Sequence, residues 1–207
     1  MSKPIILIGN GGHSAVITEI LQMMNYEIVG FTAPELQSNR YGLPYLGSDE
    51  VISHYHPNEI ELVLAIGSIR VSNVRKRFFN QYKSTGFKFT SVIHPSCIIS
   101  PTVNLGEGIQ LMAGVIIQSN VKISDNSIIN TGALIDHDCK IGSHVHVAPG
   151  CRLSGGVIVD SGCHIGTGAT VIQGISVGED TLVGAGSVVI RNVGPYKKII
   201  GVPAKEV

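Results

Sequence analysis

The sequence predicts a small parallel α/β domain over residues 1–92, a parallel β-helix of hexapeptide repeats over 93–193, and a C-terminal tail over 194–207. Three observations lead to this prediction. An aliphatic residue recurs at every sixth position, seventeen times in succession, from Ile93 to Val189. Four residues after each of these stands a second residue that is small or apolar. Before Ile93, short aliphatic runs alternate with helical patterns and glycine turns, as in α/β folds.

A period of six fits neither the 3.6-residue repeat of an α-helix nor the alternation of a plain strand. It is the period of a parallel β-helix. Each hexad supplies one short strand and one turn, so three hexads close a triangular coil of about 18 residues. Seventeen hexads then give between five and six coils, stacked at roughly 4.8 Å. A β-sandwich is the alternative, but its turns recur at variable spacing.

The N-terminal pattern predicts elements in an alternating order. They are a strand over 3–9, a glycine turn, a helix over 15–24, a strand over 27–31, a strand over 61–66 that ends at Gly67, a helix over 71–83 and a fourth strand over 87–92. The glycine turn, Gly9 to Gly12, stands between a strand and a helix, where backbone N–H groups can approach a phosphate. It departs from the G-x-G-x-x-G fingerprint, and no acidic residue ends the second strand, so the sequence does not favour a dinucleotide cofactor.

Composition excludes several partners. Lys plus Arg and Asp plus Glu both number 15, so the formal net charge is zero and no basic surface for nucleic acid or anionic lipid is expected. No apolar stretch approaches the length of a membrane span. The apolar run at the N-terminus is too short for a signal peptide, so a cytoplasmic protein is expected.

Four cysteines share the second repeating position: Cys97, Cys139, Cys151 and Cys163. Residues stacked on adjacent coils are three hexads apart in the sequence, and no two of these cysteines have that separation. We therefore expect buried free thiols instead of disulfides, as in a reducing compartment.

Among the eight histidines, His137 stands at an outward position of its hexad between Asp136 and Asp138. A neighbouring carboxylate can fix the proton on one ring nitrogen and stabilise the imidazolium form. With an ordinary pKa near 6.5, such a histidine can accept a proton at neutral pH. Gly155 occupies the same column as His137 one coil later, and a backbone N–H there can face a developing oxyanion.

Three features together resemble a known family. They are the unbroken hexads, the run from Asn130 to Gly142 that contains His137 and Asp138, and the terminal Gly-Val-Pro-Ala-Lys over 201–205. These are similar to the hexapeptide acyltransferases, more narrowly to the PglD and NeuD family of bacterial nucleotide-sugar N-acetyltransferases and sialic acid O-acetyltransferases. The resemblance covers nearly the whole chain. It implies a left-handed coil, acetyl-CoA as co-substrate, and a homotrimer with active sites between subunits.

The resemblance also implies roles for particular residues. His137 is the expected general base and Asp138 its acidic partner, where the family usually has Glu. In the coil, Asn130 is expected near the substrate and His146 near the thioester, and CoA is expected along the positions of Gly155, Thr167, Ala185 and Lys205. In the N-terminal domain, a nucleotide sugar is expected at Gly11, Gly12, His13 and Gly67.

Where the family often carries an acidic pair that reads a uracil-type base, this chain has Thr32 and Ala33. UDP-, dTDP- and GDP-linked sugars therefore all stay open. His146 and His164 lie one coil apart and are expected to stack, which suggests a metal site. Their spacing does not match the close histidine pair of the zinc-dependent γ-carbonic anhydrases, and no metal is expected.

The sequence thus favours an acetyl-CoA-dependent N-acetyltransferase acting on the amino group of a nucleotide-linked 4-amino-deoxysugar by direct attack on the thioester. Two alternatives remain. One is a sialic acid O-acetyltransferase, and the other is a non-catalytic sugar-binding module built on the same coil.

Overall fold

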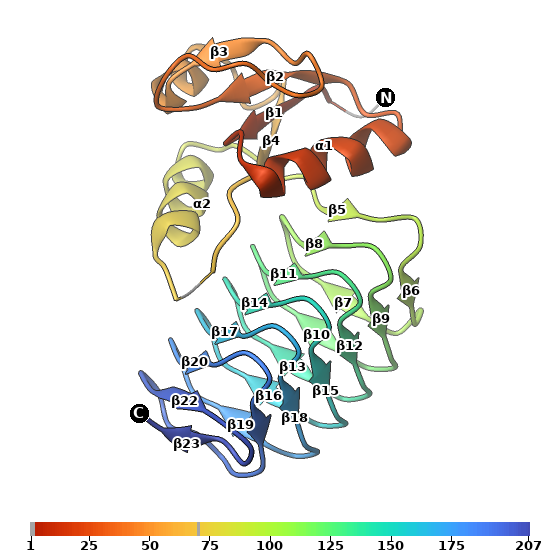
Figure 1. The fold of residues 1–207 in the computed structure, drawn as a ribbon. Helices are drawn as coiled ribbons and strands as arrows, with labels where there is room; N and C mark the ends of the chain where they lie inside the picture. The colour runs from red at the N-terminus through yellow and green to blue at the C-terminus, as the bar shows by residue number, and fades with distance from the viewer. Residues whose placement is uncertain (1–2, 70) are drawn as a thin grey trace. The chain divides into compact units, whose positions relative to one another are not determined.

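The computed structural model describes residues 3–69 and 71–207, which form two compact units (Figure 1). Unit 1 comprises the chain up to residue 67 together with 74–92. Unit 2 comprises 68–73, apart from residue 70, together with 93–207. Among the described residues, no helix is long and apolar enough to cross a membrane.

Unit 1 is a four-stranded parallel sheet with strand order β3-β2-β1-β4. Its strands are β1 (Ile5–Ile8), β2 (Ile28–Thr32), β3 (Tyr45–Gly47) and β4 (Glu61–Leu64), and its helices are α1 (Gly12–Met23), α2 (Val74–Ser84) and the 3-10 helix η1 (Asp49–His54). The central strand β1 is buried along its whole length. This is the parallel α/β domain that the alternating pattern predicts.

The prediction of a fourth strand over residues 87–92 is wrong. Phe89 makes one isolated bridge to Leu62, and only Val92 belongs to a strand, the first one of the coil. The apolar alternation of this segment serves packing on α2 instead. The ring of Phe89 stacks on Phe79 at 4.6 Å between centroids, and the ring of Phe87 meets Tyr82 edge-on. The edge strand β3 was not expected, because its three residues lie in a stretch rich in glycine and proline.

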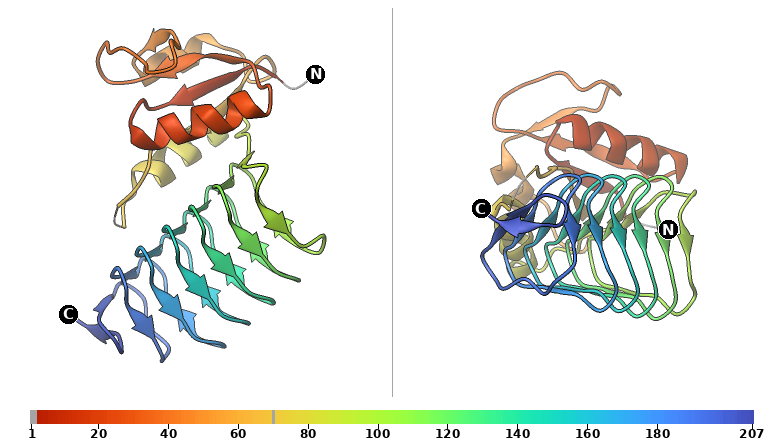
Figure 2. Two further views of the ribbon diagram at one scale, coloured as in Figure 1. Left: turned by 45° about the vertical axis from the view of Figure 1, so that its right-hand side comes forward. Right: turned by 60° about the horizontal axis from the view of Figure 1, so that its bottom comes forward.

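Unit 2 is the predicted parallel β-helix. Seventeen two-residue strands each end on one of the repeating aliphatic residues: β5 (Val92–Ile93), β6 (Ile98–Ile99), β7 (Asn104–Leu105), β8 (Gln110–Leu111), β9 (Ile116–Ile117), β10 (Lys122–Ile123), β11 (Ile128–Ile129), β12 (Leu134–Ile135), β13 (Lys140–Ile141), β14 (His146–Val147), β15 (Arg152–Leu153), β16 (Ile158–Val159), β17 (His164–Ile165), β18 (Thr170–Val171), β19 (Ser176–Val177), β20 (Leu182–Val183) and β21 (Val188–Val189). Each pairs in parallel with the strand three hexads away, as Ile128, His146 and His164 do. Figure 2 shows the resulting stack of coils.

The strands form three sheets, which are the three sides of the coil. Sheet B contains β5, β8, β11, β14, β17 and β20; sheet C contains β6, β9, β12, β15, β18 and β21; sheet D contains β7, β10, β13, β16 and β19. The tail extends sheet B with β22 (Lys198–Ile200) and the antiparallel β23 (Lys205–Glu206). The repeating aliphatic residues and the residues four positions later fill the interior, including three buried free cysteines, so the prediction of free thiols agrees with the structure.

Fourteen successive turns of the coil each contain one left-handed residue. From Gly108 to Gly186, the third residue after every repeating aliphatic position has a φ between 51° and 75°. Glycine, Asn and Asp dominate this position because they tolerate the left-handed region best. The left-handed residue turns the chain inward, and the residue before it is left at the corner of the coil. His137 occupies such a corner, and Asp138 is the left-handed residue that follows it (φ 61°).

Candidate functional site

His137 and Asp138 form a hydrogen-bonded pair at the corner between sheets C and D. The His137 Nδ1 atom lies 2.8 Å from Asp138 Oδ2, and both side chains are more than half exposed, at 61% and 58%. The shorter Asp side chain therefore reaches the imidazole. Since a carboxylate only accepts, Nδ1 carries the hydrogen and Nε2 is left as the basic nitrogen.

The backbone of this corner is fixed by the coils on either side. The N–H of Asp138 donates to the Ser119 carbonyl (3.0 Å), and the carbonyl of His137 accepts from the Gly156 N–H (2.8 Å). Asn120 Nδ2 donates to Asp138 Oδ1 at 3.3 Å. The carboxylate is thus held by Asn120 on one oxygen and by the imidazole on the other.

These contacts shift both pKa values in the direction that keeps the pair charged. The hydrogen bond from His137, with a further bond from Asn120, lowers the pKa of Asp138. The hydrogen bond to Asp138, followed by the charge of Asp136, raises the pKa of His137 above its ordinary 6.5. An imidazole with a raised pKa is a stronger base, and it is neutral only at correspondingly higher pH.

Gly155 lies next to the basic edge of this imidazole. A Cβ atom added to Gly155 would be 2.6 Å from both Cε1 and Nε2 of His137. The stacking expected from their positions on successive coils is therefore present, and the structure brings Gly155 and His137 together.

A shallow groove of about 250 Å³ runs across β9, β12 and β15 to this corner. Its walls are apolar at Ile116 and Leu134, and it ends at Asp136 and Ser154, which directly precede His137 and Gly155 in the chain. Arg152 continues the row of Ile116 and Leu134, so the surface that leads up to this corner combines apolar side chains with one cationic side chain.

His146 and Asn130 lie elsewhere, on sheet B and at its corner with sheet C. Asn130 Oδ1 accepts the N–H of Thr131 (2.8 Å), which orients Asn130 Nδ2 toward His146 Nε2 at 3.1 Å. His146 Nε2 is therefore the acceptor, and Nδ1–H donates to Ser68 Oγ at 2.9 Å. Because Nδ1 of His146 already carries the hydrogen that it donates to Ser68, it cannot activate Ser68 as a nucleophile.

His164 lies next to His146 on the adjacent coil, as the sequence predicts, and the two rings meet edge-on with centroids 4.9 Å apart. Burial lowers the pKa of His164, which keeps the ring neutral. No group of three or more His, Cys, Asp or Glu side chains arranged to hold a metal ion occurs within residues 3–69 and 71–207.

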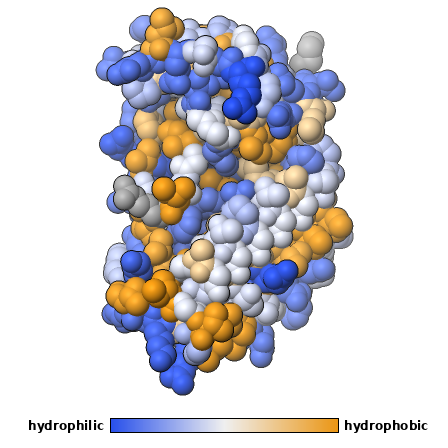
Figure 3. Space-filling model, in the orientation of Figure 1, coloured by the Kyte–Doolittle hydropathy of each residue, from blue (hydrophilic) through white to orange (hydrophobic). Residues whose placement is uncertain are grey.

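Thr167 and Ala185 follow one another on adjacent coils at the corner between sheets B and C, on the same column as Thr131. The tail packs beside them: Val188 donates its N–H to the Gly201 carbonyl, and Gly201 donates to Ser187 Oγ. Glycines and other small residues make this corner a pale band across the coil in Figure 3. Lys205 extends the same sheet in β23, so it is part of an ordered strand with an exposed side chain.

Within one chain, the expected site residues of the coil therefore fall into two groups. His137, Asp138 and Gly155 lie at the corner between sheets C and D. Asn130, His146, Thr167, Ala185 and Lys205 lie at the corner between sheets B and C or on sheet B. One side of the triangle separates the two groups.

In unit 1, the expected residues gather where the sheet order reverses. β1 lies between β2 and β4, so the loops after β1 and β4 meet at the carboxyl ends of the strands, the edge at which α/β sheets bind ligands. His13 lies in the first turn of α1, directly after the first loop, and Gly67 lies in the second loop. A Cβ on Gly67 would lie 3.0 Å from the His13 Cβ, so glycine is needed for this close approach.

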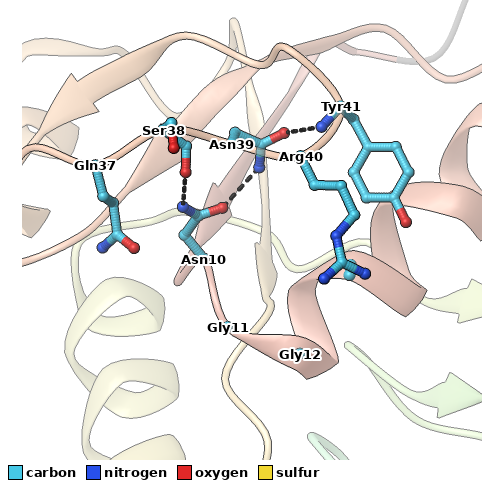
Figure 4. A pocket seen from close by; sticks show the side chains of 9 residues that line it. Asn10, Gly11, Gly12, Gln37, Ser38, Asn39, Arg40 and Tyr41 are labelled. Carbon is cyan, nitrogen blue, oxygen red and sulfur yellow. Dashed lines mark hydrogen bonds between the residues drawn. The ribbon is translucent and has the colours of Figure 1, made fainter.

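The N-terminus of α1 opens into a polar pocket. Gly11 precedes the helix and supplies no side-chain cap, so the N–H groups of the first turn face outward with the positive end of the helix dipole. The pocket, of about 500 Å³, is lined by Asn10, Gly11, Gly12, Ala15 and residues 37–41. Arg40 extends from the overlying loop toward the helix N-terminus (Figure 4).

Hydrogen bonds hold that loop above the glycine turn. Asn39 Nδ2 donates to Asn10 Oδ1 (2.6 Å), and Asn10 Nδ2 donates to the Ser38 carbonyl (3.0 Å). The sequence reasoning missed Asn39, Arg40 and Ser68, because they lie in irregular stretches without a repeat. The one feature of the sequence that could have pointed to Arg40 as a phosphate ligand is its positive charge in the loop after the second strand.

Thr32 and Ala33 do not line this pocket. Thr32 is fully buried and donates its hydroxyl to Asp49 Oδ1, while Ala33 is buried and donates its N–H to the Gly47 carbonyl. These residues secure the edge of the sheet. They are not available to read a nucleobase directly.

The chain is similar to several known proteins. The chain matches the PglD N-terminal domain over residues 4–82 and the bacterial transferase hexapeptide model over 120–155. It is 38% identical to PerB from Caulobacter crescentus, solved in complex with CoA and GDP-perosamine, with a TM-score of 0.91 over 99% of this chain and 97% of that chain. The chain belongs to the PglD-like family of sugar N-acetyltransferases.

Two further solved structures are similar over all of both chains. The acetyltransferase domain of PglB from Neisseria gonorrhoeae is 30% identical, with a TM-score of 0.94, and has also been solved with acetyl coenzyme A. WeeI from Acinetobacter baumannii is 25% identical, with a TM-score of 0.89. Membership of this family confirms the expected fold, an acyl-CoA-dependent acyltransferase, and acetyl-CoA as co-substrate.

The hydrogen bond between His137 and Asp138 leads to a prediction about the imidazole pKa of His137. Asp138→Asn should lower the imidazole pKa of His137, because the carboxylate that stabilises the charged ring is lost while only Asp136 remains nearby. The neutral fraction of His137 at pH 7 should therefore rise. Asn suits the left-handed backbone, as Asn120 and Asn126 show. A pH titration of the ¹⁵N-labelled imidazole by NMR measures this.

The matched control is Asp180→Asn, which replaces a carboxylate at the equivalent left-handed position of another corner (φ 51°). It should leave the His137 titration unchanged. An unaltered His137 pKa in Asp138→Asn would mean that the pair does not form in solution.

Proposed function

We propose that this protein transfers the acetyl group of acetyl-CoA to the amino group of a GDP-linked amino sugar, with His137 as general base. The observation that carries the proposal is the imidazole of His137, which is bound through Nδ1 to Asp138 and presents a basic Nε2 at an exposed corner. The proposal is supported by the similarity of the whole chain to PerB, an enzyme solved with CoA and GDP-perosamine.

The reaction proceeds by direct attack. The amine nitrogen of the sugar bonds to the thioester carbon as His137 Nε2 accepts one amine proton, and the carbonyl electrons move to oxygen. Collapse of the tetrahedral intermediate restores the carbonyl and breaks the carbon–sulfur bond. The proton on His137 passes to the departing thiolate, so the products are the amide and free CoA. A neutral amine is already a nucleophile, so no acyl-enzyme is needed.

Unit 1 is proposed to bind the nucleotide sugar. The uncapped N-terminus of α1 supplies N–H groups and a partial positive charge to the diphosphate at Gly11 and Gly12. Arg40 supplies a full positive charge from the opposite wall of the pocket. His13 and Gly67 lie in close contact at the same edge of the sheet, and we assign the sugar to these two residues.

The choice of GDP follows from the relative that binds it. Thr32 and Ala33 stand where the family often has an acidic pair that reads a uracil-type base. Because both residues are buried, they offer no contact of their own to a nucleobase.

CoA is proposed to bind along Thr167, Ala185 and the segment that ends in Lys205, with Asn130 and His146 near its acyl end. Since these residues and His137 occupy different corners of one coil, we propose a homotrimer in which one subunit supplies the base and its neighbour the CoA corner. The exposed side chain of Ile98, with Ile116 and Leu134 on sheet C, gives an apolar surface for such contacts. A reaction that uses acetyl-CoA and a nucleotide sugar fits a cytoplasmic enzyme.

The proposal is tested by thiol release from acetyl-CoA against a panel of UDP-, dTDP- and GDP-linked amino sugars and sialic acid. The GDP-linked amino sugar should be turned over fastest. His137→Ala should reduce kcat by roughly 10²–10⁴, the usual worth of a general base. Binding of both substrates should persist, since a histidine-to-alanine variant of the perosamine N-acetyltransferase was solved with CoA and GDP-perosamine.

His54→Ala, at an exposed histidine of unit 1, is the control and should keep full activity. Turnover of sialic acid alone would replace the proposal by O-acetylation. Thiol release from no acceptor would favour a binding module. A wild-type rate in His137→Ala would remove His137 as the base.

The role of Arg40 gives a separate prediction. Arg40→Met keeps the length of the side chain and removes its charge, so the KM for the nucleotide sugar should rise by roughly 10-fold or more, the worth of a hydrogen bond to a charged group. The KM for acetyl-CoA should stay unchanged. Arg191→Met, at an exposed arginine of the coil, should change neither constant. Equal KM values for Arg40→Met and wild type would exclude a contact with the diphosphate.

A further inference from the structure

Gly155 is unusual among the corner residues of the coil. It is the single glycine among the seventeen residues that stand two positions after a repeating aliphatic residue. The other sixteen are Pro95, Pro101, Glu107, Ala113, Ser119, Asp125, Thr131, His137, Ser143, Pro149, Ser161, Thr167, Gln173, Glu179, Ala185 and Arg191. Side chains of every kind are thus accommodated at this position elsewhere.

The backbone of Gly155 does not require glycine. The next residue, Gly156, has a φ of 69° in the left-handed region, where glycine is favoured, but the φ of Gly155 lies outside that region. The absence of a side chain at residue 155 therefore has another cause.

That cause is the imidazole of His137. A Cβ on Gly155 would lie 2.6 Å from Nε2, 2.6 Å from Cε1 and 3.3 Å from Cδ2 of His137, much closer than van der Waals contact. At Gly156 and Gly174, by contrast, an added Cβ would meet nothing within 4 Å. The ring thus occupies the volume that any other residue at position 155 would fill.

We infer that Gly155 is a positioning residue whose missing side chain provides the seat for the imidazole of His137. The expected effect on the rate rests on the proposed function, in which His137 is the base. The position of the ring rests on the geometry alone. Asp138 fixes the Nδ1 edge of the imidazole from one side. Because Gly155 has no side chain, the opposite edge of the imidazole, which carries the basic Nε2, can lie against the next coil.

This role differs from the one expected from the sequence, in which the N–H of Gly155 faces the thioester oxygen. Alanine separates the two roles, because it retains the backbone N–H and adds only the methyl group. The fold should tolerate the change, since Ala113 and Ala185 occupy the same position in other hexads. The ring is the flexible end of a side chain, so it is the ring that must move.

The first measurement is kinetic. Gly155→Ala should lower kcat by roughly 10²-fold, the cost of displacing a catalytic group by about 1 Å. The KM for acetyl-CoA and the melting temperature should stay near wild type. Gln173→Ala, one coil further along the same corner, is the matched control and should be fully active.

The second measurement is a double-mutant cycle. If Gly155 acts through His137, Gly155→Ala should slow the His137→Ala enzyme no further. A further loss of similar size in that background, or a raised KM for acetyl-CoA, would overturn the inference and assign Gly155 to the cofactor or the oxyanion.

The third measurement does not depend on activity. The imidazole ¹⁵N and ¹H resonances of His137 should shift in Gly155→Ala and not in Gln173→Ala. Unchanged resonances would overturn the inference whatever the kinetics. If His137→Ala keeps full activity while these resonances shift, the proposed base fails and the positioning of the ring by Gly155 stands.

Discussion

The parallel pairing of each residue with the residue three hexads later is the constraint on which the structure of the coil depends. Every strand has only two residues, so no strand is stable by itself, and each one gains its partners from the coils before and after it. The aliphatic position fills the interior at each step, and a left-handed residue closes each corner from Gly108 to Gly186. One displaced register would move interior side chains outward, so the period cannot vary along the stack.

The same constraint creates the chemistry at the corner. Residues at corners are held by backbone bonds to both neighbouring coils, as His137 is through Gly156 and Asp138 through Ser119. Side chains at the same place on successive coils are then brought together with little freedom. Asn120 positions the carboxylate of Asp138 from one coil, and Gly155 leaves space for the imidazole on the next. Asn120, the His137–Asp138 pair and Gly155 thus come from three successive coils.

In the proposed mechanism, the two corners of the coil serve different parts of the acetyl transfer. The exposed corner with His137 holds a basic nitrogen, whereas the corner with Thr167 and Ala185 is smooth and made of small residues. His146 is not available as a base, because Asn130 and Ser68 are hydrogen-bonded to its two ring nitrogens. Unit 1 contributes a different device, the open N-terminus of a helix beside an arginine, which suits an anionic nucleotide better than an acyl group.

The sequence by itself determined the coil, its period and the stacking of His146 on His164 and of Gly155 on His137, because a strict repeat converts separation in sequence directly into position in space. It also marked His137 and Asp138, since neighbouring residues need no fold to bring them together. Only the tertiary structure decided that Thr32 and Ala33 are buried, that residues 87–92 pack on α2 instead of forming a strand, and that Arg40 faces the N-terminus of α1. These features lie in irregular segments, where packing between distant residues sets the conformation and no period reports it.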